Sequence, residues 1–201
     1  MRKSTGVLAL GVMAASAAQA NALSLGDIAP MSTVKMKSVD GREQSIADVR
    51  GVKGTLVMFS CNHCPYVKAW ENRIAAIGNG APAQGIGVIV INSNDPSEYA
   101  DDDFPEMQKR AKEKGFRFPY VVDATSDVAR AFGATRTPEV YLFDDAGKLV
   151  YKGAIDDNAQ DADKVKSRYL ADAIDALSSG REIAEKESRA IGCSIKFRSA
   201  R

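Results

Sequence analysis

Two predominantly apolar runs, Thr55–Phe59 and Ile86–Ile91, constrain the fold of this chain more than any other feature. A strand that is apolar at successive positions is buried on both faces, which is typical of the parallel sheets of α/β proteins. Four further runs resemble strands, namely Met31–Met36, Pro119–Val122, Glu139–Phe143 and Leu149–Lys152. Because a turn-like sequence at 144–147 separates the last two, they are expected to form a hairpin.

Helical patterns alternate with these strands. The four patterns run from Pro65 to Gly78, from Phe104 to Gly115, from Ser126 to Gly133 and from Val165 to near Gly180. Ser126 is expected to cap the third helix. The alternation predicts an α/β sandwich around a central mixed sheet, with residues 21–180 as a single domain. Residues 181–201 form a mixed-charge tail that contains Cys193.

The first twenty residues have the layout of a secretory signal peptide. Arg2 and Lys3 precede an apolar stretch, which ends in the small-residue pattern Ala18-Gln19-Ala20. The apolar part is well below the ~20 residues that span a bilayer, so cleavage is favoured over a membrane anchor. We therefore expect residues 1–20 to be removed, a mature chain that begins at Asn21 without a membrane span, and a periplasmic or otherwise exported location.

The charge balance excludes some classes of partner. Of the 27 Lys and Arg residues, two lie in the predicted signal peptide, which leaves 25 against 26 Asp and Glu. A mature chain so close to neutrality has no general electrostatic attraction for nucleic acid or for an anionic membrane. Neither is expected as a partner.

Cys61 and Cys64 form a Cys-x-x-Cys motif where a buried strand is expected to end and a helix to begin. The N-terminus of a helix presents unpaired N–H groups and the positive end of its dipole, and both favour a thiolate. Thiols in such motifs have pKa values below about 8.5, the value of a free thiol. We therefore expect Cys61 to be an exposed nucleophile and Cys64 to be the resolving thiol.

A Cys-x-x-Cys motif can also belong to a structural zinc site or to a buried structural disulfide. A zinc site needs two more ligands, and the chain offers only His63 and Cys193 as further His or Cys residues. Because the motif lies at a strand-to-helix junction in a chain with an export signal, redox chemistry is favoured over both. Cys193 itself is open between a buried core thiol, an alternative resolving thiol and a third metal ligand.

Three segments carry a resemblance to a known family, namely Leu25–Pro30, Phe59–Lys68 and Ile191–Lys196. Through them, residues from about 24 to 178 resemble the thioredoxin superfamily, within it the redoxin or peroxiredoxin-like branch (AhpC/TSA-like). The resemblance implies a thioredoxin-like sandwich with an N-terminal β extension. It also implies a cis proline at Thr137-Pro138, opposite the cysteine pair, in a loop that presents backbone groups to the substrate.

The chain departs from the patterns of these families in two ways. No carboxylate occurs from Gly51 to Cys61, so the buried acid that assists the resolving thiol of thioredoxin has no obvious counterpart. True peroxiredoxins carry Pro and Thr or Ser seven and three residues before the reactive cysteine, whereas these positions here are Gly54 and Met58. The peroxidase pocket is therefore not visible in the sequence.

The expected function is thiol–disulfide exchange on protein thiols or disulfides, together with a redox partner protein. The cysteine pair would itself be the redox carrier, without an organic cofactor or a metal. Asn62 and His63 are expected to tune the pair, and a ring N–H of His63 to donate to the Cys61 sulfur and lower its pKa. The alternatives are a thiol peroxidase that uses Cys61 and a copper-binding protein that uses Cys61 and Cys64, with His63 or Cys193.

Overall fold

A mixed seven-stranded sheet forms the centre of the molecule in the computed structural model, which describes residues 22–199. The predicted signal peptide lies outside these residues. The strands are β1 (Met36–Ser38), β2 (Glu43–Gln44), β3 (Gly54–Phe59), β4 (Ile86–Asn92), β5 (Tyr120–Val122), β7 (Glu139–Asp144) and β8 (Leu149–Gly153). Their order is β2-β1-β5-β4-β3-β7-β8, and a separate pair consists of β6 (Arg136–Thr137) and β9 (Cys193–Ser194).

The central strands have the parallel pairing that their apolar sequences predict. Strand β4 runs parallel to both β3 and β5, whereas β7 is antiparallel to β3 and to β8. The hairpin predicted at 144–147 joins β7 to β8, and Gly147 adopts a φ of 78° in its turn. Strands β1 and β2 extend the far edge of the sheet as the expected N-terminal β extension.

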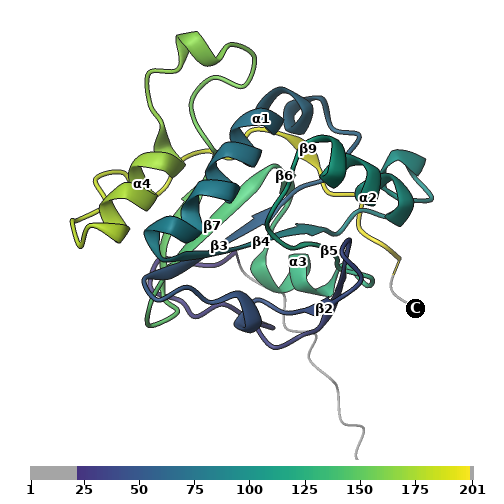
Figure 1. The fold of residues 1–201 in the computed structure, drawn as a ribbon, viewed down its shortest axis with the longest axis horizontal. Helices are drawn as coiled ribbons and strands as arrows, with labels where there is room; N and C mark the ends of the chain where they lie inside the picture. The colour runs from purple at the N-terminus through teal and green to yellow at the C-terminus, as the bar shows by residue number, and fades with distance from the viewer. Residues whose placement is uncertain (1–21, 200–201) are drawn as a thin grey trace, which may run out of the picture.

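Helices cover both faces of this sheet (Figure 1). The helices are α1 (Pro65–Gly80), α2 (Phe104–Glu113), α3 (Asp127–Phe132) and α4 (Tyr169–Ser178), with short 3-10 turns at η1 (Ala47–Val49), η2 (Ala81–Gln84), η3 (Ala100–Asp102) and η4 (Ala162–Lys164). Helices α1, α2 and α4 contribute to one hydrophobic core, and α3 contributes to the other. Leu56 and Met58 of β3 enter the first core, whereas Val57 and Phe59 enter the second. The predicted α/β sandwich is thereby confirmed.

Three local predictions are wrong. Residues 31–33 form a turn in which the Val34 N–H donates to the Met31 carbonyl at 3.0 Å, so the strand begins only at Met36. Ser126 precedes α3 but does not cap it, because its hydroxyl donates to the Ser93 carbonyl at 2.7 Å. Val165 lies outside the last helix, which begins at Tyr169.

The C-terminal tail packs on the domain. Ile183 and Ile195 are buried, and the bridge between Asn94 and Phe197 continues the contact beyond β9. Between residues 22 and 199, no helix is both long enough and apolar enough to cross a membrane.

Candidate redox site

The two cysteines of the motif lie where the sequence predicts, between the end of β3 and the start of α1. Cys64 is the N-cap residue of α1, with Pro65 at the first helical position, where its missing N–H costs no hydrogen bond. Cys61 lies three residues earlier, and all three cysteines of the chain are free thiols in this structure. The junction thus places two thiols at one end of a buried strand.

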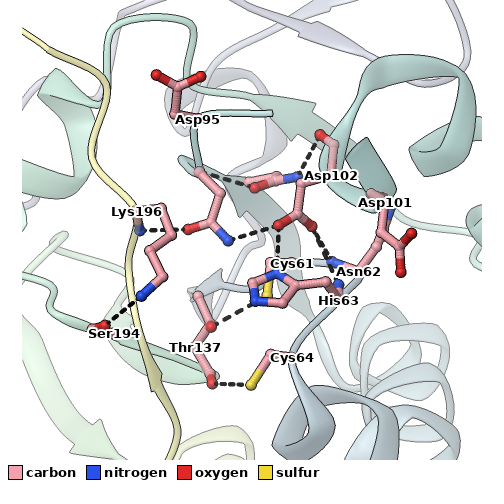
Figure 2. A network of polar contacts seen from close by, with 12 residues as sticks. Cys61, Asn62, His63, Cys64, Asp95, Asp101, Asp102, Thr137, Ser194 and Lys196 are labelled. Carbon is pink, nitrogen blue, oxygen red and sulfur yellow. Dashed lines mark hydrogen bonds and ion pairs between the residues drawn. The ribbon is translucent and has the colours of Figure 1, made fainter. Parts of the chain in front are cut away.

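Thr137 contacts both sulfurs (Figure 2). Its Oγ1 lies 3.3 Å from the Cys61 Sγ, and its carbonyl oxygen accepts a hydrogen bond from the Cys64 thiol at 3.2 Å. The peptide bond between Thr137 and Pro138 is cis, as the resemblance implied. Residues more than seventy positions apart in the sequence therefore meet at the cysteine pair.

The prediction that Cys61 is exposed is wrong. Its exposed fraction is 2%, and that of Cys64 is 0%. The predicted direction of the Cys61 pKa is also reversed. The hydrogen bond to Cys64, burial and the nearby Asp102 carboxylate all raise the pKa of Cys61.

The pKa of Cys64 is shifted in the opposite direction. The hydrogen bond from Cys61 lowers the pKa of Cys64 below that of an ordinary thiol, although burial opposes the change. The Cys193 side chain and the backbone N–H groups of Val67 and Cys193 also lower it. Since the Val67 N–H belongs to the first turn of α1, the helix start does favour a thiolate, but on the second cysteine of the motif.

Asp102 is the residue that sequence reasoning missed. Its side chain is fully buried, and it lies in η3, about forty residues after the motif. It accepts hydrogen bonds from the Asn62 N–H at 2.5 Å and the Asn94 side-chain amide at 2.8 Å, and its Oδ2 lies 2.7 Å from the His63 Nδ1 (Figure 2). A buried acid therefore does stand beside the pair, although β3 contributes none.

His63 is oriented by this carboxylate and by an aromatic ring. Its imidazole stacks on Tyr99 with ring centroids 3.8 Å apart and an interplanar angle of 9°. Among the described residues, no hydrogen bond joins His63 to Cys61, so the predicted donation to the sulfur is absent. His63 contacts Asp102 instead.

Asn62 anchors the motif rather than facing the sulfurs. Its side-chain amide donates to the Asp101 carbonyl at 2.7 Å, and its Oδ1 accepts from the Tyr120 hydroxyl at 3.0 Å. Burial raises the pKa of Tyr120 well above its ordinary value, so this hydroxyl remains a donor. A partly buried guanidinium completes the anchor, since Arg110 donates to the Asn62 carbonyl at 3.4 Å and to Glu71 at 3.0 Å.

One group in the described part of the chain has the geometry to hold a metal ion. Cys61, His63 and Asp102 each place a potential ligand atom within 4.8 Å of the other two. Cys64 and Cys193, which the copper-binding alternative invoked, do not belong to this group. The Asp102 oxygens are already engaged by protein donors, so a metal would have to compete with these hydrogen bonds.

Comparison with known proteins places this chain in a family. The sequence profile of the AhpC/TSA family matches residues 25–152. The chain belongs to the AhpC/TSA family. Among relatives of this AhpC/TSA chain, the thiol–disulfide oxidoreductase ResA of Geobacillus thermodenitrificans is 28% identical over 131 residues, which cover 64% of this chain and 68% of ResA. ResA of Halalkalibacterium halodurans is 23% identical over 57% of this chain and 61% of its own length.

Solved structures share the fold over almost the whole AhpC/TSA chain. An uncharacterized conserved protein of Geobacillus kaustophilus is 38% identical with a TM-score of 0.83, covering 90% of this chain and 96% of its own. A hypothetical protein of Sinorhizobium meliloti is 30% identical with a TM-score of 0.82, covering 90% and 98%. A peroxidoxin of Mycobacterium tuberculosis, 14% identical with a TM-score of 0.58 and covering 78% and 96%, shares the fold alone. The thioredoxin-like fold is therefore confirmed.

Proposed function

We propose that this protein is an exported thiol–disulfide oxidoreductase in which Cys61 and Cys64 form the redox-active pair. The observation that carries the proposal is the placement of both thiols of the motif at the start of α1, in contact with the residue before a cis proline. The Thr137 Oγ1 lies 3.3 Å from the Cys61 Sγ and its carbonyl oxygen lies 3.2 Å from the Cys64 Sγ, while the pKa of Cys64 is lowered and that of Cys61 is raised. Thiol–disulfide exchange requires a thiolate as nucleophile, and the lowered pKa of Cys64 favours its formation at that sulfur.

The surroundings of the pair support reversible exchange. Oxidation joins the two sulfurs, releases the Cys61 proton and passes two electrons to the disulfide that is reduced. Because Thr137 contacts both sulfurs, it would keep them in register through the cycle. The loop at Thr137 and Pro138 would also orient a substrate backbone, while Asn62 and His63, both bonded to Asp102, would hold the motif in place.

The partners and location follow from the same proposal. The substrates would be protein thiols or disulfides, and a separate redox protein would restore the starting state of the pair. The disulfide itself would be the redox carrier, with no organic cofactor and no metal. Residues 1–20 would direct export and be removed, and residues 21–180 would form the redoxin domain.

Reduction of insulin disulfides by dithiothreitol provides the test. The wild-type protein should accelerate insulin precipitation, and Cys64→Ser should abolish the acceleration because it removes the thiol whose pKa is lowered. Ser60→Ala is the matched control, since Ser60 is equally buried next to the motif but carries no thiol. Consumption of hydrogen peroxide by Cys61 without any acceleration of insulin reduction would instead assign the protein as a thiol peroxidase.

A further inference from the structure

The burial of the pair raises a problem of access. Cys61 and Cys64 have exposed fractions of 2% and 0%, so a cysteine of a folded partner protein does not reach either sulfur in this arrangement. Cys193 is half-buried and is the most accessible of the three thiols. An accessible thiol packed beside the pair would therefore give the pair a route to an external thiol.

Strand β9 holds Cys193 against the residue that contacts both sulfurs. In its antiparallel pairing with β6, Cys193 lies opposite Thr137, and the Ile195 N–H donates to the Thr135 carbonyl at 3.0 Å. Directly opposed residues in such a pair have Cα atoms about 4.5–5.5 Å apart. The approach is so close that a Cβ atom on Gly192 would lie 2.2 Å from the Thr137 carbonyl oxygen. The tail strand thus adds an extended backbone beside the cysteine pair.

The Cys193 thiol is coupled to Cys64 of the motif. Cys193 packs against the hydrophobic core that includes Cys61 and Cys64, and it lies opposite Thr137, whose carbonyl oxygen is 3.2 Å from the Cys64 Sγ. Its side chain and backbone N–H are among the groups that lower the pKa of Cys64. Burial raises the pKa of Cys193 to about 11, and its hydrogen bond to Cys64 acts in the same direction. Cys64 therefore has a thiol neighbour on each side, Cys61 within the motif and Cys193 in the tail.

We propose that Cys193 is a third redox thiol, which relays the disulfide between the buried pair and the cysteines of partner proteins. The proposal rests on the function proposed above and names the group through which that function reaches its substrates. It also gives a role to the tail: strand β9 pairs with β6 and holds Cys193 next to Thr137 as an internal substrate cysteine.

The relay balances without a further oxidant. In the oxidised protein, the Cys193 sulfur attacks the Cys64 sulfur, the Cys61–Cys64 bond breaks, and the Cys61 sulfur leaves and takes up the Cys193 proton. A partner thiolate then attacks Cys193, the Cys64–Cys193 bond breaks, and Cys64 leaves as its thiolate. A second thiol of the partner then attacks the partner sulfur of the mixed disulfide. Cys193 leaves and takes up the proton of this second thiol. The partner is oxidised by two electrons, and the pair is reduced by two.

The test uses two single variants of the full chain that each keep two thiols. After equilibration with oxidised glutathione, free thiols are alkylated and the linked peptides are mapped by mass spectrometry. Cys61→Ser should lose both remaining thiols to an intramolecular Cys64–Cys193 disulfide. Cys64→Ser is the matched control and should form no Cys61–Cys193 disulfide, since Cys193 contacts Cys64.

A third variant separates the failure of this inference from the failure of the proposed function. Cys193→Ser should still form the Cys61–Cys64 disulfide but should lose most of its rate of exchange with insulin. The relay is refuted if Cys61→Ser keeps two free thiols under conditions in which Cys193→Ser forms its Cys61–Cys64 disulfide. It is also refuted if Cys193→Ser exchanges with insulin as fast as the wild-type protein. If Cys61→Ser does not fold, mapping a Cys64–Cys193 fraction in the oxidised wild-type protein decides the same point.

Discussion

Replacement of Asp102 by asparagine tests how the polar network supports the pair. The carboxylate is fully buried, and each of its oxygens faces protein donors: Oδ1 accepts from the Asn62 N–H at 2.5 Å, and Oδ2 accepts from the Asn94 amide at 2.8 Å. Asparagine has the same shape but a single acceptor oxygen. If that oxygen stays on Asn62, the new amide group faces the Asn94 amide, and two donors oppose each other.

The expected loss of stability follows from this mismatch. One buried polar group left without a partner costs about 1–3 kcal/mol. For a chain of this size each kcal/mol lowers Tm by about 2–4 °C, so Asp102→Asn should lower Tm by about 2–12 °C. Asp101→Asn is the matched control, because that side chain is 61% exposed and its ion pair with Lys68 is long, at 3.6 Å. Its effect should stay within about 0.5 kcal/mol.

The same substitution should also change the chemistry of Cys61. The Asp102 carboxylate is one of the groups that raise the pKa of Cys61, so removing its charge should lower this pKa. The assay is the pH dependence of iodoacetamide alkylation at Cys61, measured by peptide mass in Cys64→Ser and in Cys64→Ser with Asp102→Asn. The reasoning is refuted if the Cys61 pKa does not fall, or if Asp102→Asn is as stable as Asp101→Asn.

Three further predictions concern the ends of the chain and the thiolate. Intact mass of the secreted protein should give Asn21 as the first residue, and retention of the first twenty residues would contradict export with cleavage. The reduced protein should show thiolate absorbance at 240 nm at pH 7, which is lost only on acidification, and Cys64→Ser should lack it because the lowered pKa belongs to Cys64. Gly192→Ala should push β9 away from Thr137 and speed hydrogen exchange in residues 193–195, whereas unchanged exchange would show that the tail tolerates a Cβ there.

The sequence predicts the parts of the fold that depend on local pattern. The buried strands Thr55–Phe59 and Ile86–Ile91 correspond to β3 and β4 within one residue at each end, because their apolar composition leaves few alternatives. The strand predicted at Met31–Met36 is wrong over most of its length, since residues 31–33 form a turn and β1 begins only at Met36, and a side-chain pattern does not distinguish such a turn from a strand.

The site is harder to predict because tertiary contacts determine its electrostatics. A motif and a family resemblance are enough to find Cys61, Cys64 and Thr137. They do not reveal Asp102, because it lies in an acidic run, Asp101–Asp103, that resembles the start of a helix. Only Asp103 has that role, with its carboxylate accepting the Glu106 N–H at 2.8 Å. The fold turns Asp102 inward, where its charge contributes to the reversal of the expected pKa of Cys61.

A redox titration of Cys193→Ser in glutathione buffers tests the central claim most directly. With the relay thiol removed, only Cys61 and Cys64 remain to exchange electrons. The account predicts a reversible two-electron transition, with a Cys61–Cys64 disulfide in the mapped peptides of the oxidised form and two alkylated thiols in the reduced form. Persistence of two free thiols across the whole range of buffers, or a transition in which glutathione stays attached to a single cysteine, would contradict it.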